Sequence, residues 1–160
     1  MLGRRRGSAP DLPLAADERL LAHAEGPDGA VGGTRAALYL PIRVPWERVA
    51  SAGWDEEGSR LRVVEQAPWG EVAPEHVRRL DDAGRLLQLV RERVTASLVL
   101  QRSVAVHGSR SVRILARRAP AGDGPIAWFV EYDAGLDPTD PSVRAVVDDA
   151  LDRARGDVGD

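Results

Sequence analysis

The chain has 160 residues and a formal net charge of −3; 43% of its residues are hydrophobic and 29% are charged. This size and balance predict one globular domain with its own core. The absence of cysteine excludes disulfides and thiolate metal sites, and the net charge argues against general nucleic-acid binding.

All 22 basic residues are arginine. Either the chain reflects GC-rich, bacterial codon usage, or the arginines serve bidentate contacts with anions. Residues 1–10 predict a disordered tail, whose three arginines (positions 4–6) are expected to be solvated, with contact to anionic lipid or nucleic acid as the alternative. No long apolar run follows this tail, and residues 94–100 are too few to span a membrane. A soluble, cytoplasmic protein is therefore expected.

Residues 11–73 predict a β-rich half. A first strand is expected at residues 19–24, with a short turn or helix from Glu18 as the alternative, followed by a turn at residues 26–29. Further extended segments are expected at residues 36–40, 42–46 and 60–65, with another beginning near Ala52, one helical turn at residues 46–52 and an acidic hairpin loop at residues 55–59.

Residues 74–156 predict a helix, a hairpin and a second helix. Apolar residues recur every three or four positions over residues 75–101, which predicts a long helix that begins near Pro74 or is divided at Gly84. Strands are then expected at residues 103–107, 111–118 and 126–133, and a helix at residues 142–155 with Asp140 as its N-cap. Together these elements predict a single α+β domain over residues 11–156. In it, an antiparallel sheet of six or seven strands is packed by a long central helix and a C-terminal helix.

One local pattern resembles a known module. Thr34 and Arg35 open a strand, residues 44–46 read Val-Pro-Trp, and Gly58 precedes a strand at residues 60–64. Residues 33–65 thus resemble the middle strands of bacterial PH-like domains. The resemblance implies a partly open β-barrel capped by a C-terminal helix, and contacts with protein or lipid headgroups rather than catalysis. After Gln66 the chain departs from that plan, because a long helix is expected in place of further barrel strands.

Motifs for catalysis or metal binding are missing from the sequence. The three histidines (positions 23, 76 and 107) lack the spacing of a metal site, and no nucleophile motif accompanies them. The acidic loop at residues 55–57 and the aspartates near residue 137 do not follow a calcium-loop pattern. We therefore predict no enzyme activity, no metal and no cofactor.

The candidate contact residues are tryptophans and arginines. Tryptophans at positions 46 and 128 fit the core, whereas Trp54 and Trp69 flank loops and are candidate anchors for a partner. Arginines of the long helix and of the hairpin end would form a cationic groove if they converge; the alternative is paired surface arginines. The candidate binding residues are Trp54, Trp69, Arg85, Arg91, Arg93, Arg102, Arg117 and Arg118.

The sequence thus predicts a non-enzymatic binding or scaffold module that contacts a protein or an anionic ligand. The alternative is an enzyme or small-ligand carrier with a pocket between the sheet and the long helix. Homodimerisation through a sheet edge is a third possibility.

Overall fold

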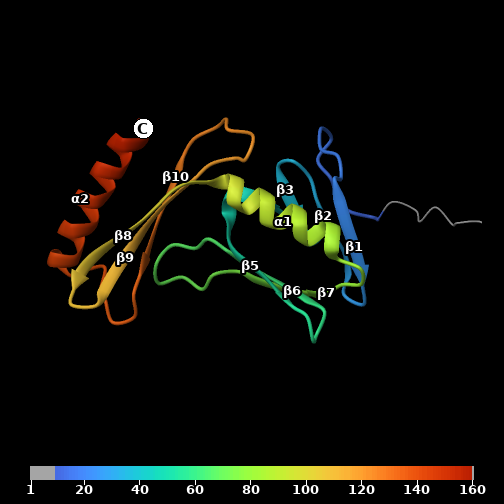
Figure 1. The fold of residues 1–160 in the computed structure, drawn as a ribbon, viewed down its shortest axis with the longest axis horizontal. Coiled ribbons are helices and arrows are strands. Elements are labelled where there is room, and N and C mark those ends of the chain that lie inside the picture. Colours follow the sequence, from blue (N-terminus) through green and yellow to red (C-terminus); the bar gives the residue numbers. More distant parts are fainter. Residues whose placement is uncertain (1–9, 160) are drawn as a thin grey trace, which may run out of the picture.

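The computed structural model describes residues 10–159, which form ten strands, one short 3-10 helix and two α-helices (Figure 1). Residues 1–9, with most of the predicted tail, lie outside the described residues. The predicted α+β class is confirmed, with one helix in mid-chain and one at the C-terminal end. The prediction of one sheet with six or seven strands is wrong, because the strands divide into antiparallel sheets of four, three and three.

The first sheet is an antiparallel meander with its apolar residues turned inward. Its strands are β1 (Ala22–Gly26), β2 (Gly29–Gly33), β3 (Ala37–Tyr39) and β4 (Arg43–Pro45). The turn between β1 and β2 falls where the Gly-Pro-Asp-Gly signal predicts it. Val31, Leu38 and Val44 are buried and belong to the core between this sheet and the next.

The second sheet follows a 3-10 turn, η1 (Trp46–Arg48). Its strands are β5 (Val49–Asp55), β6 (Arg60–Glu65) and β7 (Glu75–Arg79), with β6 in the middle. The two sheets meet where Glu25 pairs with Asp81 in an isolated bridge. A Cβ on Gly26 would lie 1.9 Å from the carbonyl oxygen of Arg79, so the two backbones approach this closely only because residue 26 has no side chain.

Strand β7 corrects the prediction that a helix begins at Pro74. Its partly buried side chains are polar: His76 Nε2 lies 2.8 Å from an oxygen of Glu65, and Arg78 donates to the carbonyl oxygen of Leu40 at 2.6 and 3.1 Å. Its apolar residue, Val77, is 42% exposed. The strand therefore carries no inward apolar alternation, which is the signal by which a strand is recognised.

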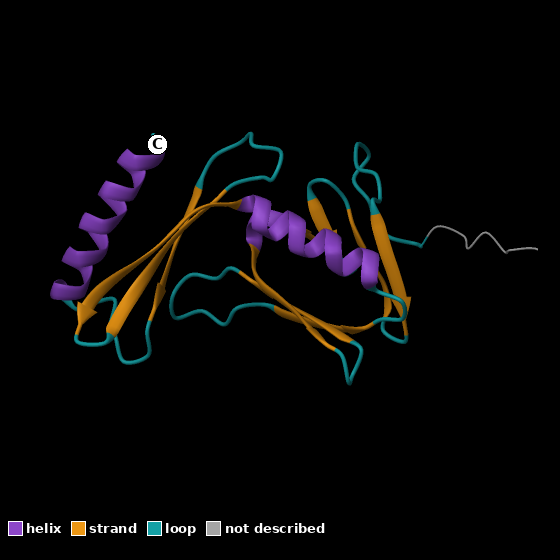
Figure 2. Ribbon diagram, viewed as in Figure 1, coloured by secondary structure: helices purple, strands orange, loops and turns teal. Residues whose placement is uncertain are grey.

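Helix α1 (Gly84–Ser97) packs against β1, β2, η1 and β5, and it lies across the two sheets in Figure 2. It buries Leu86, Leu89 and Val90. The helix ends at Ser97, whose hydroxyl donates to the carbonyl oxygen of Val94 at 2.7 Å. The predicted continuation to residue 101 is wrong, because Leu98 adopts an extended backbone and begins the next strand.

The second half is a three-stranded sheet with one helix on it. Its elements are β8 (Leu98–His107), β9 (Arg110–Arg117), β10 (Ala127–Tyr132) and α2 (Pro141–Val158), with β9 central. Helix α2 buries Val143, Val147 and Ala150. The predicted N-cap is confirmed, because the Asp140 side chain accepts from the Ser142 backbone N–H at 2.8 Å. Neither α-helix of residues 10–159 has the length and hydrophobicity needed to cross a membrane.

The core of the first half is centred on Trp46, which is fully buried, as the sequence predicts. Its indole N–H donates to the carbonyl oxygen of Thr34 at 2.9 Å. A Cβ on Gly33 would lie 2.6 Å from Leu89 Cδ2 and 3.1 Å from the Trp46 ring. The indole therefore fills the space where the first sheet, the turn η1 and helix α1 meet.

We expect Trp46→Ala to lower the free energy of unfolding by about 3–5 kcal/mol, because it leaves a large cavity and an unpaired carbonyl. Trp69→Ala is the matched control, since Trp69 is 57% exposed; it should change the free energy by less than about 1 kcal/mol. Urea unfolding followed by far-UV circular dichroism measures both. Equal losses for the two variants would contradict a core role specific to Trp46.

Candidate functional site

A groove of about 310 Å³ lies between strand β5 and helix α1. Its apolar wall combines Trp54 of β5, Leu61 of β6 and three residues of the helix, Leu87, Val90 and Val94. Trp54 is half-buried and lies directly across from Leu61 in the sheet register. The groove is also lined by two exposed charged side chains, Arg91 of the helix and Glu56 of the β5–β6 loop.

The groove runs beside a free strand edge. Among residues 10–159, β5 pairs with β6 alone and is an outer strand of its sheet. Ser51, Ala52 and Gly53 are exposed, and a Cβ placed on Gly53 would have open space around it. Backbone N–H and C=O groups along such an edge are free to pair with another chain.

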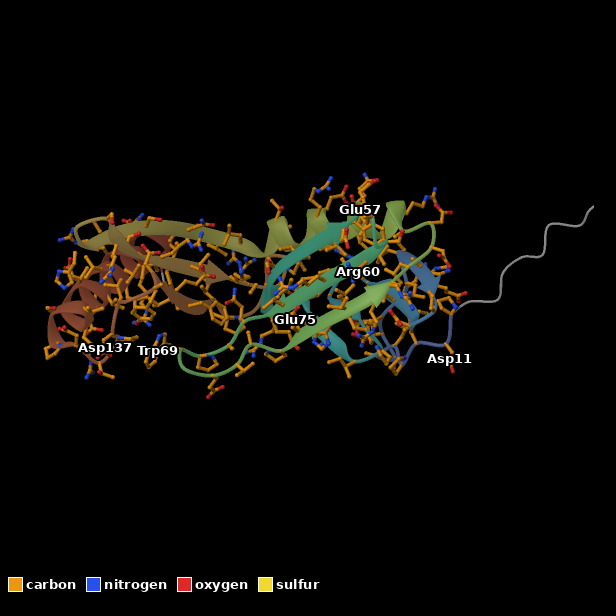
Figure 3. All side chains as sticks on the ribbon, turned by 90° about the horizontal axis from the view of Figure 1, so that it is seen from below. Asp11, Glu57, Arg60, Trp69, Glu75 and Asp137 are labelled. Atoms are coloured by element: carbon orange, nitrogen blue, oxygen red, sulfur yellow. The ribbon has the colours of Figure 1, made fainter. Side chains whose placement is uncertain are left out.

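A second, larger cleft of about 670 Å³ lies between the β6–β7 connection and the sheet of the second half. Figure 3 shows Trp69 on that connection, beside the second-half sheet. The Trp69 and Tyr132 ring centroids are 6.5 Å apart with an interplanar angle of 70°, which is an edge-to-face contact. Gln66, Arg113 and Arg117 also line this cleft.

Arg117 is buried at the junction of the two halves. Its Nη1 donates to Ser97 Oγ at 2.9 Å and to the carbonyl oxygen of Val94 at 3.3 Å. Burial lowers the pKa of the Arg117 guanidinium, and the negative charge of Glu131 opposes that change. Arg117 Nε has no hydrogen-bond partner within the described residues, and the same holds for Gln66 Nε2.

The other predicted arginines do not join one groove. Arg91 lines the β5–α1 groove and Arg117 lines the larger cleft, whereas Arg85, Arg93, Arg102 and Arg118 line neither. Arg102 lies on β8 rather than on the long helix, and its Nη2 is 2.9 Å from Asp157. The two predicted tryptophans are also separated, with Trp54 in the groove and Trp69 in the cleft.

Two of the three histidines have structural partners. His76 faces Glu65, and His107 Nε2 lies 3.4 Å from the Ser142 hydroxyl. Within residues 10–159, no group of three or more histidine, aspartate or glutamate side chains is arranged to hold a metal ion.

A polar cluster around Glu18 has the residue types of a catalytic site but the bonding of a structural one. Its carboxylate accepts from Tyr39 OH at 2.6 Å, Thr34 Oγ1 at 2.7 Å and Arg43 Nε at 2.8 Å. Burial raises the pKa of Glu18, but these hydrogen bonds outweigh burial and the net pKa is lowered. An ionised carboxylate whose oxygens are already occupied is a poor general base. The cluster instead fastens the segment before β1 to the first sheet.

Some lining residues were not predicted from the sequence. Gln66 and Tyr132 stand in a connection and at a strand end, where nothing in their local pattern marks a site. Leu87 and Val94 belong to the apolar stripe of the helix, and they face the sheet at the open groove. The exposed Gly53 within a strand was an available signal, because a strand glycine marks a place where another backbone approaches closely.

Comparison of the chain with protein-family models, with curated protein sequences and with solved structures finds no match in any of the three.

We expect Glu18→Gln to lower the free energy of unfolding at neutral pH by about 1.5–3 kcal/mol, because charge-assisted hydrogen bonds are lost. The folded-state pKa of Glu18 is lowered. Its stabilisation is therefore complete above the unfolded pKa of about 4.3 and is lost as the pH falls through the folded value. Urea unfolding of both proteins from neutral to acid pH should show the difference shrinking as the pH falls.

The exposed Glu57→Gln is the control and should match the wild type throughout. If the free energies of unfolding of Glu18→Gln and the wild type differ by the same amount across this pH range, the ionised Glu18 carboxylate does not provide the stabilisation.

Proposed function

We propose that the chain is a non-enzymatic binding module that takes an extended peptide segment along the free edge of β5. The observation that carries this proposal is the groove itself, where an unpaired strand edge lies directly beside an apolar wall. In β-strand addition, main-chain hydrogen bonds supply affinity and pockets for alternate side chains supply specificity. The β5–α1 groove offers both kinds of contact.

The groove also indicates the character of the segment. Trp54, Leu87 and Val94 offer an apolar surface for one or two side chains of the peptide. Arg91 is exposed and lines the same groove, so an acidic side chain of the peptide would have a cation beside it. The preferred partner is therefore a protein segment in extended conformation, rich in β-branched or apolar residues and carrying one acidic residue.

A PH-like fold for the first half is part of the same proposal. What supports it is the order of elements: a four-stranded sheet, a three-stranded sheet and then helix α1 packed against both. The sequence suggested that the chain departs from the PH-like plan after Gln66, with a helix in place of further strands. Strand β7 supports the PH-like plan instead, since it is a further strand that precedes the helix. Bacterial origin, a cytoplasmic location and homodimerisation through a sheet edge stay predictions.

A library of random twelve-residue peptides displayed on phage tests the groove. We expect selection on the full chain to enrich peptides with alternating apolar residues and one acidic residue. Arg91→Glu should raise the Kd of a selected peptide at least about tenfold, which corresponds to a loss of about 1.4 kcal/mol in binding free energy. Ala52→Leu should weaken peptide binding similarly, because residue 52 is exposed, lines the groove and lies on the same face of β5 as Trp54. Isothermal titration calorimetry measures both.

Arg85→Glu is the matched control, because this exposed arginine lies on the same helix but outside the groove. It should leave peptide affinity unchanged. The proposal is wrong if no peptide is enriched, or if selected peptides bind Arg91→Glu and Ala52→Leu as tightly as the wild type.

A further inference from the structure

The cleft between the β6–β7 connection and the second-half sheet is a separate place from the β5–α1 groove. The two share no lining residue. The cleft volume of about 670 Å³ lies in the range of small-molecule sites, about 300–1,000 Å³. Its function is therefore a question independent of the peptide groove.

The cleft contains a buried positive charge without a paired carboxylate. Arg117 is 6% exposed and forms no ion pair within residues 10–159. The carboxylates nearby have other partners, because Glu131 is bound by Arg113 and Glu65 faces His76. A buried cation without a counter-ion is unfavourable, and an anion that entered the cleft would offset it.

Two buried donors in the same cleft also lack acceptors. Arg117 Nε and Gln66 Nε2 have no hydrogen-bond partner in the described part of the chain, and both side chains are more than nine-tenths buried. Unpaired buried donors are rare in folded proteins, and each one costs free energy. Both residues line the cleft. A group with two acceptor oxygens and a negative charge would accept hydrogen bonds from both side chains and offset the charge of Arg117.

The rest of the lining is mixed, because apolar and aromatic side chains lie beside charged ones, Glu65, Glu71, Glu131 and Arg113. Val64, Leu115 and Val130 line the cleft, together with the rings of Trp69 and Tyr132. Trp69 is 57% exposed, so much of its ring surface is free to cover a bound molecule. The apolar and aromatic part of this surface favours a ligand with an apolar body attached to its anionic group.

We infer that this cleft binds an organic carboxylate with an apolar body. The carboxylate accepts hydrogen bonds from Arg117 and Gln66, and the body packs against Trp69, Tyr132 and Val130. Because solvent does not reach the two unpaired N–H groups in the free chain, these side chains turn toward the ligand as it enters. A free aliphatic acid and the C-terminal carboxylate of a peptide share this chemistry.

The test uses the full chain labelled with ¹⁵N and four probes: octanoate, its neutral amide, and one short Val-Leu-ending peptide with a free or an amidated C-terminus. We expect octanoate or the free-acid peptide to shift the indole N–H signal of Trp69 and to leave that of Trp54 in place. Trp69→Phe and Trp54→Phe assign the two signals. The matching amide should bind at least tenfold more weakly. Whichever of the two acids binds more tightly identifies the source of the carboxylate.

Variants of Gln66 and Arg117 test whether each donor binds the ligand or only supports the fold. Gln66→Met keeps the side-chain length and removes the donor, and Arg117→Met removes the charge. Each substitution should lower the affinity for the acid at least tenfold. Arg102→Met is the control, because this arginine pairs with Asp157 away from the cleft, and it should bind as the wild type does. If Arg117→Met does not fold, Gln66→Met and the amide comparison decide the question.

The inference is overturned if neither acid binds, if acid and amide bind equally, if the Trp69 signal does not move, or if Gln66→Met binds like the wild type. None of these results bears on peptide binding in the β5–α1 groove, which Arg91→Glu tests separately.

Discussion

The arrangement of the first half depends on the burial of Trp46 at the corner between its two sheets. The chain changes sheets at this residue, after Pro45 and through the turn η1. The indole packs close to Gly33 and donates to the carbonyl oxygen of Thr34, so the corner is fixed by packing and by one directed hydrogen bond. Helix α1 closes the same core through Leu86 and Leu89. The free edge of β5 and the apolar side of α1 face each other because this corner sets their separation.

The sequence predicted the elements whose signals are local. The Gly-Pro-Asp-Gly turn, the acidic hairpin loop, the helical turn near Trp46 and the Asp140 N-cap all lie where residue type alone places them. These features depend on a few consecutive residues and on backbone preferences. The α+β class and the two helices could be predicted for the same reason. The division into three sheets could not, because it depends on which strands pair across long sequence separations.

The errors have one physical cause, which is tertiary contact that overrides the local pattern. Strand β7 faces inward with His76 and Arg78, whose polar groups find partners in Glu65 and in the Leu40 carbonyl. Because β7 has no apolar alternation, the helical period of residues 75–101 wrongly predicts a helix where this strand lies. At the other end, Leu98 continues the apolar stripe of α1 but adopts an extended backbone. The candidate sites were affected in the same way. Arg91 of the long helix and Arg117 of the hairpin end line different cavities, and Arg102 lies on β8 rather than on the helix.

The two cavities differ in chemistry but share one structural link. Val94 lines the β5–α1 groove, and its carbonyl oxygen accepts from Arg117, which lines the larger cleft. A change at Arg117 therefore alters the C-terminal end of α1 as well as the cleft, and its effects cannot be assigned to one site. Arg91 lines the groove but not the larger cleft, and Gln66 lines the larger cleft but not the groove. Binding at the two places is separable at those residues, because each can be altered while the Val94–Arg117 contact stays intact.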